Sequence, residues 1–165
     1  SKDRDLEIET ADVAQFAHEV IGTIETRMRG ANIACRTQYH ESLGEFDIDR
    51  ELARTALLNI LENALEACIE DPDQISHRVD YRVRSEGDDV LFEIADDGPG
   101  MEPDQIKKIF TLFFSSKGKR GTGLGLFITH KVIKQHGGSV RVESSPGRGT
   151  VFRVRLPRKP PGRVA

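Results

Sequence analysis

The sequence has no tryptophan and only two cysteines, Cys35 and Cys68, among its 165 residues. The two cysteines form no Cys-x-x-Cys pair and have no pair of histidines near them in the sequence. Their spacing therefore predicts neither a zinc site nor a disulfide framework. We expect both side chains to be reduced and half-buried in the core.

The sequence also lacks a long apolar run and a large excess of either charge. No apolar stretch reaches the roughly 20 residues that span a bilayer, and residues 1–5 lack the pattern of a signal peptide. The formal net charge is -3, so no overall basic field favours nucleic acid or an anionic membrane surface. We expect a cytoplasmic fragment that contacts neither.

The length and the apolar content are typical of one compact domain. Of the 165 residues, 37% are hydrophobic, which is enough to build a core. The chain begins in a charged segment and ends in a proline-rich one, as expected of a domain excised from a longer protein. We expect the domain to occupy residues 11–157, with linker at 1–10 and a disordered tail at 158–165.

The spacing of apolar residues predicts a mixed succession of helices and strands. Asp49 is a suitable N-cap for a helix that must stop before Pro72. Helical periodicity covers residues 11–29, 49–70, 103–109 and 122–136. Strand-like runs cover residues 33–40, 79–84, 90–95, 140–142 and 152–156. This order predicts an α/β (α+β) two-layer sandwich, with about three helices on one face of a mixed sheet.

The helix over 49–70 carries polar side chains on the face opposite its apolar residues, namely Asn59, Asn63, Glu66 and Glu70. An ordinary solvated face is one interpretation. Asparagine is a poor residue in the middle of a helix, however, and a solvated face would more naturally use Glu, Lys or Gln. Two amide oxygens one turn apart would suit Mg²⁺ that already carries phosphate and water.

Two glycine clusters follow, at residues 96–101 and 121–126. Asp96 ends an apolar strand at the first cluster, where it forms either a plain Asx-turn or an acceptor for the amino group of adenine. The second cluster opens a helix, whose N-terminal N–H groups favour anions. Either cluster alone is weak evidence.

Residues 101–121, between the clusters, are predicted to form a mobile lid. Lys117, Lys119 and Arg120 could reach phosphate oxygens, and for Lys119 we favour plain solvation. Phe110, Phe113 and Phe114 lie in this otherwise polar region. At least one of them is expected to anchor the loop to the core, and the others could contact a partner.

Taken together, these segments resemble the ATP-binding catalytic module of sensor histidine kinases of the nitrogen-regulatory type. This module has the Bergerat fold that gyrase, Hsp90 and MutL ATPases share. The resemblance covers nearly the whole chain, with all motifs in the right order. Residues 59–67 resemble the N box, 96–101 the G1 box, 110–117 the F box, 121–126 the G2 box and 147–150 the last glycine motif.

The resemblance implies a role for each matching residue. Asn63, assisted by Asn59, would coordinate Mg²⁺, while Asp96, with Thr150 beside it, would recognise adenine. Many members have a Lys at the position of Glu66, so the cation that binds phosphate would instead be Lys117. Asn59, Asn63 and Lys117 would be the catalytic residues. The nucleotide would be bound by Asn59, Asn63, Glu66, Asp96, Gly98, Gly100, Met101, Lys117, Gly121, Thr122, Gly123, Leu124, Gly125, Leu126 and Thr150.

The resemblance also implies an activity and partners. The domain would transfer the γ-phosphoryl group of Mg-ATP to a histidine on a separate dimerisation domain, for relay to the receiver domain of a response regulator. Residues 1–10 would then be the remnant of a linker from the dimerisation helices. We expect a monomeric fragment of a homodimeric parent, which is either cytoplasmic or anchored in the inner membrane. His18 is followed by Glu19 but lacks the rest of the acceptor motif, so the phosphorylated histidine is expected elsewhere.

Other proteins with this fold remain alternatives: an ATPase that acts as a conformational clamp, a serine kinase of the anti-sigma type, and a non-catalytic nucleotide sensor. In the hydrolytic relatives a Glu one turn before the metal-binding Asn activates water. Asn59 occupies that place, and an amide cannot take a proton. A neutral imidazole attacks with its own lone pair, so this substitution favours transfer to histidine. The complete set of motifs argues against a degenerate sensor.

Overall fold

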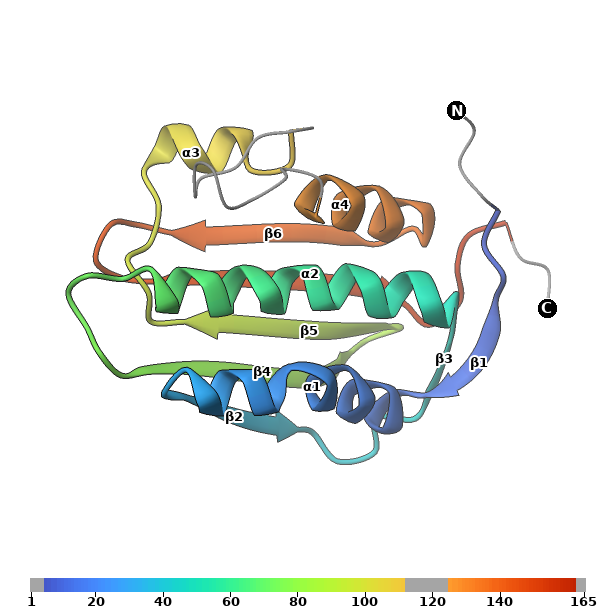
Figure 1. Ribbon diagram of the computed structural model, residues 1–165. Helices are drawn as coiled ribbons and strands as arrows, with labels where there is room; N and C mark the ends of the chain where they lie inside the picture. The colour runs from blue at the N-terminus through green and yellow to red at the C-terminus, as the bar shows by residue number, and fades with distance from the viewer. Residues whose placement is uncertain (1–4, 112–124, 163–165) are drawn as a thin grey trace.

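The fold is built on a mixed sheet of five strands. A computed structural model describes residues 5–111 and 125–162 (Figure 1). The strand order is β2 (Ile33–Tyr39), β4 (His77–Glu86), β5 (Asp89–Asp96), β7 (Thr150–Pro157) and β6 (Ser139–Ser144). Strands β2 and β4 are parallel, and all other neighbours in the sheet are antiparallel.

Three helices cover one face of this sheet, as Figure 1 shows: α1 (Val13–Gly30), α2 (Arg50–Ile69) and α4 (Gly125–Gln135). A short helix, α3 (Pro103–Lys108), follows the first glycine cluster. The core lies between the two layers, where the rings of Phe16, Phe46 and Phe92 pack together. The predicted two-layer architecture is confirmed.

Helix α2 begins and ends as its sequence predicts. The side chain of Asp49 caps it by accepting a hydrogen bond from the N–H of Leu52 at 3.1 Å. The apolar face is buried, with Leu57 and Leu61 completely inaccessible, while Asn63 on the other face is half-buried. At 20 residues α2 is the longest helix in the described segments, and none of those helices has the length and apolarity of a bilayer span.

A second, two-stranded sheet was not predicted from the sequence. Strand β1 (Glu9–Asp12) pairs antiparallel with β3 (Glu45–Ile48). Near the C-terminus, the backbone N–H of Arg158 donates to the carbonyl of Asp88 at 3.0 Å, and its carbonyl accepts from the N–H of Asp47 in β3 at 2.7 Å. The packed structure therefore extends past both predicted limits, into the residues assigned to linker and tail.

His136 follows α4, where its position suggests a cation that interacts with the helix dipole. That interpretation is wrong, because His136 is buried and both ring nitrogens have uncharged partners. Nε2 accepts a hydrogen bond from the N–H of Asp49 at 3.0 Å, and Nδ1 lies 2.9 Å from the carbonyl oxygen of Val132. The ring is therefore neutral, and burial lowers its pKa.

This burial predicts a loss of stability in mild acid. The pKa of His136 is lowered from 6.5, so the unfolded chain binds the proton first. The stabilisation is complete above pH 6.5 and declines as the pH falls towards the folded-state pKa, by at most about 1.4 kcal/mol per pH unit. His136→Gln keeps an acceptor for Asp49 but does not titrate. We expect urea unfolding between about pH 5 and 7.5 to show a shallower pH dependence for this variant than for the wild type.

The control is Thr55→Ala, an exposed change that involves no titrating group, which should keep the wild-type pH dependence of unfolding. An equal slope for His136→Gln and the wild type would contradict the neutral, buried state of His136.

Candidate functional site

The structure brings several of the predicted site residues together around one cavity. It has a volume of about 200 Å³ and lies between α2 and the segment that follows β5. Its walls are formed by Asn63, Ala67, Glu70, Pro99, Gly100, Met101, Gln105 and Thr150. Residues more than 80 positions apart in the sequence thus share one pocket, and they include four residues of the predicted site.

Asp96 lies at the end of β5, directly opposite Thr150 of β7. Its side chain is buried, at 7% exposure, and one carboxylate oxygen accepts a hydrogen bond from the N–H of Gly98 at 2.9 Å. The Asx-turn is therefore real. It does not exclude a ligand role, because an ionised carboxylate has two oxygens and about four acceptor sites.

The glycines of the first cluster are required by close contacts within the protein. Gly100 has a φ of +74°, and a Cβ there would overlap the carbonyl oxygen of Ser145. A Cβ on Gly98 would lie 3.0 Å from Oδ1 of Asp96 and 3.3 Å from Cβ of Ala67. Because these two positions have no side chain, the loop can pack closely against α2 and against Ser145, the residue after β6. This packing fixes the position of Gly100, which lines the cavity.

Ser144 also organises this loop, and the sequence analysis missed it. Its hydroxyl accepts a hydrogen bond from the N–H of Met101 at 2.9 Å and donates to the carbonyl of Gly149 at 2.8 Å. It also lies 2.8 Å from Oγ1 of Thr150. No local signal marks Ser144, because Met101 lies far from it in the sequence.

Asn59 holds α4 against α2. Its amide nitrogen donates to the carbonyl of Gly125 at 2.9 Å, and a Cβ on Gly125 would lie 3.5 Å from the Asn59 Cγ. One turn earlier in α2, the carbonyl of Ala56 accepts from the hydroxyl of Thr129 at 2.9 Å. The first residues of α4, Gly125 and Leu126, are thereby placed next to the polar face of α2.

Other predicted residues stand apart from this cavity or outside the description. Glu66 is half-buried on α2 and is not among the residues that line the cavity. The ring of Phe110 stacks on His130, with centroids 5.3 Å apart, and meets Phe152 edge-on, which confirms it as a core anchor. Part of the predicted lid lies in 112–124, outside the described residues, together with Phe113, Phe114, Lys117, Lys119, Arg120, Gly121, Thr122, Gly123 and Leu124.

Comparison with known proteins gives this cavity a family context. Residues 48–160 match the model of the HATPase_c family, described as histidine kinase-, DNA gyrase B-, and HSP90-like ATPase. The matched range runs from the N-cap of α2 to the end of β7, so it includes every described part of the cavity. The chain belongs to this ATPase family.

The relatives of this HATPase domain include protein kinases of bacteria. Sporulation kinase E of Bacillus subtilis (strain 168) is 30% identical over 157 residues, which are 95% of this chain and 21% of that protein. AtoS, a signal transduction histidine-protein kinase of Escherichia coli (strain K12), is 32% identical over 98% of this chain and 26% of its own length. The chain is homologous to the ATPase catalytic domain of these kinases and spans about a quarter of their length.

Solved structures show the same fold. The catalytic domain of histidine kinase ThkA superposes with a TM-score of 0.83 at 26% identity, over 96% of this chain and 100% of that one. ThkA in complex with the response regulator protein TrrA gives 0.81 at 27% identity, over 99% of this chain and 45% of that one. Full-length ShkA in complex with AMPPNP gives 0.84 at 25% identity, over 97% and 33%.

Proposed function

We propose that this HATPase domain binds Mg-ATP and transfers its γ-phosphoryl group to a histidine on the dimerisation domain of a sensor histidine kinase. The phosphoryl group would then pass to the receiver domain of a response regulator. One observation carries the proposal: Asn63, Gly100 and Thr150 line one cavity, with Asp96 buried beside it, in a chain homologous to kinase catalytic domains.

The cavity would hold the adenine end of the nucleotide. Its volume of about 200 Å³ is below the 300–1,000 Å³ typical of pockets for whole drug-sized ligands, so it suits the base alone. The Asp96 carboxylate would accept a hydrogen bond from the adenine amino group, where guanine presents a carbonyl oxygen. An unpaired buried acceptor costs about 1–3 kcal/mol, enough to favour adenine roughly tenfold or more. The ATP analogue in the ShkA complex agrees with this ligand class.

The phosphates would extend from this cavity towards the start of α4. Asn63, which lines the cavity, would provide the main protein ligand for Mg²⁺, with Asn59 and Glu66 nearby on the same helix. When bound, Mg²⁺ would neutralise charge on the phosphate oxygens. The N–H groups at the start of α4 would face the phosphates. Gly121, Thr122, Gly123, Leu124, Gly125, Leu126 and the cation Lys117 would complete this part of the site.

The carboxylates near Asn63 favour transfer over hydrolysis. Glu62 is held by Arg27 of α1, with one guanidinium nitrogen 2.9 Å from the carboxylate oxygen Oε2. It is therefore engaged in an ion pair between α1 and α2, which argues against a role as the base that activates water. Asn59, at the position where hydrolytic relatives have a Glu, donates its amide to Gly125. Positioning and charge stabilisation would then carry the transfer to a histidine nitrogen.

The histidines of the described segments support an acceptor on another domain. His77 and His136 are buried, so neither can meet a phosphate donor without unfolding. His130 stacks against Phe110. His18 and His40 are exposed, but His18 lacks the rest of the acceptor motif and His40 follows a strand rather than lying on a helix. We therefore place the acceptor on the dimerisation domain of the parent, and the complex of ThkA with TrrA supports a response regulator as the next partner.

The decisive experiment is a phosphotransfer assay with γ-labelled ATP and Mg²⁺. The chain is mixed with the dimerisation domain of its parent protein. We expect acid-labile, base-stable label on that domain, and we expect Asn63→Ala to slow labelling about 100-fold or more, because the main Mg²⁺ ligand is lost. Thr55→Ala, an exposed change on the same helix, should label at the wild-type rate.

Label on serine, or free phosphate released without labelled protein, would refute the kinase proposal. Equal rates for Asn63→Ala and Thr55→Ala would refute the role of Asn63.

A further inference from the structure

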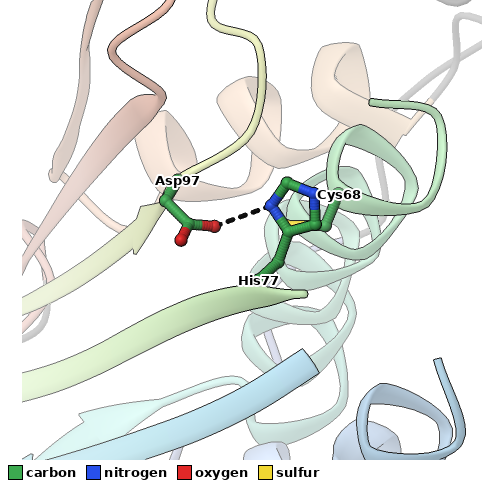
Figure 2. A group of neighbouring side chains, drawn as sticks. All are labelled: Cys68, His77 and Asp97. Carbon is green, nitrogen blue, oxygen red and sulfur yellow. Dashed lines mark hydrogen bonds and ion pairs between the residues drawn. The ribbon is translucent and has the colours of Figure 1, made fainter. Parts of the chain in front are cut away.

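Three side chains of different chemistry meet near the end of α2 (Figure 2). They are Cys68 at the end of α2, His77 at the start of β4 and Asp97 just after β5. One ligand atom from each lies within 4.8 Å of the other two. Tetrahedral zinc holds such atoms about 3.3–3.7 Å apart, given bonds of about 2.0–2.3 Å. Small side-chain movements would bring all three into that range.

His77 is held between two carboxylates, and its hydrogen bonding is incomplete. Nδ1 lies 2.8 Å from Oδ1 of Asp97. Nε2 is buried and has no hydrogen-bond partner among the described residues, although Oδ2 of Asp71 lies 3.5 Å away. The side chains of His77 and Asp71 are both only 4% exposed. A buried polar nitrogen without a hydrogen-bond partner is costly, so this arrangement requires an explanation.

A neutral imidazole can satisfy only one of the two carboxylates. With the proton on Nδ1, the 2.8 Å contact is an ordinary hydrogen bond to Asp97, and the lone pair of Nε2 faces the Asp71 carboxylate. With the proton on Nε2, the lone pair of Nδ1 faces the Asp97 oxygen, and a metal ion bound to both would remove that repulsion. The sulfur of Cys68 lies close to the same ring, so a metal ion at this place would have a third protein ligand.

We propose that Cys68, His77 and Asp97 form a binding site for Zn²⁺, separate from the magnesium site at Asn63. Thiolate, imidazole and carboxylate together are the ligands that zinc prefers. Three protein ligands leave the fourth position open, and the 41% exposure of the Asp97 side chain provides the entrance. Asp71 would accept the Nε2 proton and orient the ring from behind, as carboxylates behind zinc-bound histidines do.

The backbone supports the same geometry. The N–H of Arg78 donates to Oδ1 of Asp97 at 2.9 Å, which holds this carboxylate against His77. The site connects the ends of α2, β4 and β5, and Asp97 directly follows the adenine-binding candidate Asp96. Zinc would therefore cross-link the ends of these three elements and raise the thermal stability of the folded chain.

Without a metal ion, Cys68 is chemically inert. Burial, followed by the negative charges of Asp96, Asp97 and Asp71, raises the pKa of its thiol to about 12. A buried thiol in this environment resists oxidation, so a redox switch does not explain its place beside His77.

The test is a titration of the 165-residue chain, without nucleotide, with Zn²⁺ against a chromophoric chelator. We expect one ion per chain, with an apparent dissociation constant below about 1 μM. His77→Gln and Cys68→Ser should each weaken binding at least about tenfold, and Asp71→Asn about tenfold. Cys35→Ser is the matched control, because Cys35 lies outside the cluster, and should bind as the wild type does. Co²⁺ should show thiolate charge-transfer absorption that only Cys68→Ser removes.

Binding weaker than about 1 μM would overturn the proposal. So would Co²⁺ binding without a thiolate band, or wild-type affinity in His77→Gln. Circular dichroism of each variant separates loss of binding from loss of fold. If Cys68→Ser fails to fold, His77→Gln together with the Co²⁺ spectrum of the wild type decides the question.

Discussion

Replacing Asp96 with asparagine is expected to weaken ADP binding at least tenfold, and up to about 150-fold, as measured by titration calorimetry. The substitution turns a buried carboxylate, which only accepts hydrogen bonds, into an amide that can point a donor at the adenine amino group. An opposed or unpaired buried group costs about 1–3 kcal/mol. The fold should survive, because an amide oxygen can still accept the hydrogen bond from Gly98 that the carboxylate accepts now.

Asp88→Asn is the matched control for this change. It also removes one negative charge, but Asp88 is exposed in the turn before β5, at the opposite end of that strand from Asp96. We expect ADP affinity close to that of the wild type. If Asp96→Asn retains ADP affinity, Asp96 does not recognise adenine. If both variants lose ADP affinity equally, the loss reflects the change in charge and not a contact with adenine.

The parts of the fold that were predictable are those fixed by local chemistry. Helix α2 has an N-cap at Asp49, an apolar stripe and a proline soon after its end, and each signal acts within a few residues. Strand β7 alternates buried and half-buried residues, so its period is visible in the sequence. The motif resemblance then implied that Thr150 lies beside Asp96, and the strand register places these two residues opposite each other.

The features that were missed depend on contacts between distant segments. Strands β1 and β3 have four residues each, too few to show a period, and each is formed only because the other pairs with it. Ser144 accepts a hydrogen bond from Met101, and His136 accepts one from Asp49. The two residues of each pair are far apart in the sequence, so no local pattern predicts these contacts. Cys68 and His77 are separated by a turn that the sequence marks only by Pro72. Charge and burial at such positions follow from tertiary packing.

Gly149→Ala is expected to destabilise the domain far more than Gly147→Ala. Both glycines have positive φ, +74° at Gly149 and +79° at Gly147. An alanine in this left-handed conformation costs about 1–2 kcal/mol at either position. A Cβ on Gly147 would meet no atom within 4 Å, whereas one on Gly149 would overlap the carbonyl oxygen of Asp96. Overpacking adds about 1–3 kcal/mol. Urea unfolding should show losses of about 1–2 kcal/mol for Gly147→Ala and about 2–5 kcal/mol for Gly149→Ala.

The same pair of variants connects stability to nucleotide binding. The atom that Gly149→Ala would displace is the backbone carbonyl of Asp96, whose side chain we propose to recognise adenine. Gly149→Ala should therefore weaken ADP binding even at temperatures where it is fully folded, while Gly147→Ala should not. If both variants lose the same free energy of unfolding, the loop accommodates the Cβ at position 149 without an additional loss of stability. An unchanged ADP affinity would mean that the position of Asp96 depends on its contact with Gly98 rather than on the close approach of β7.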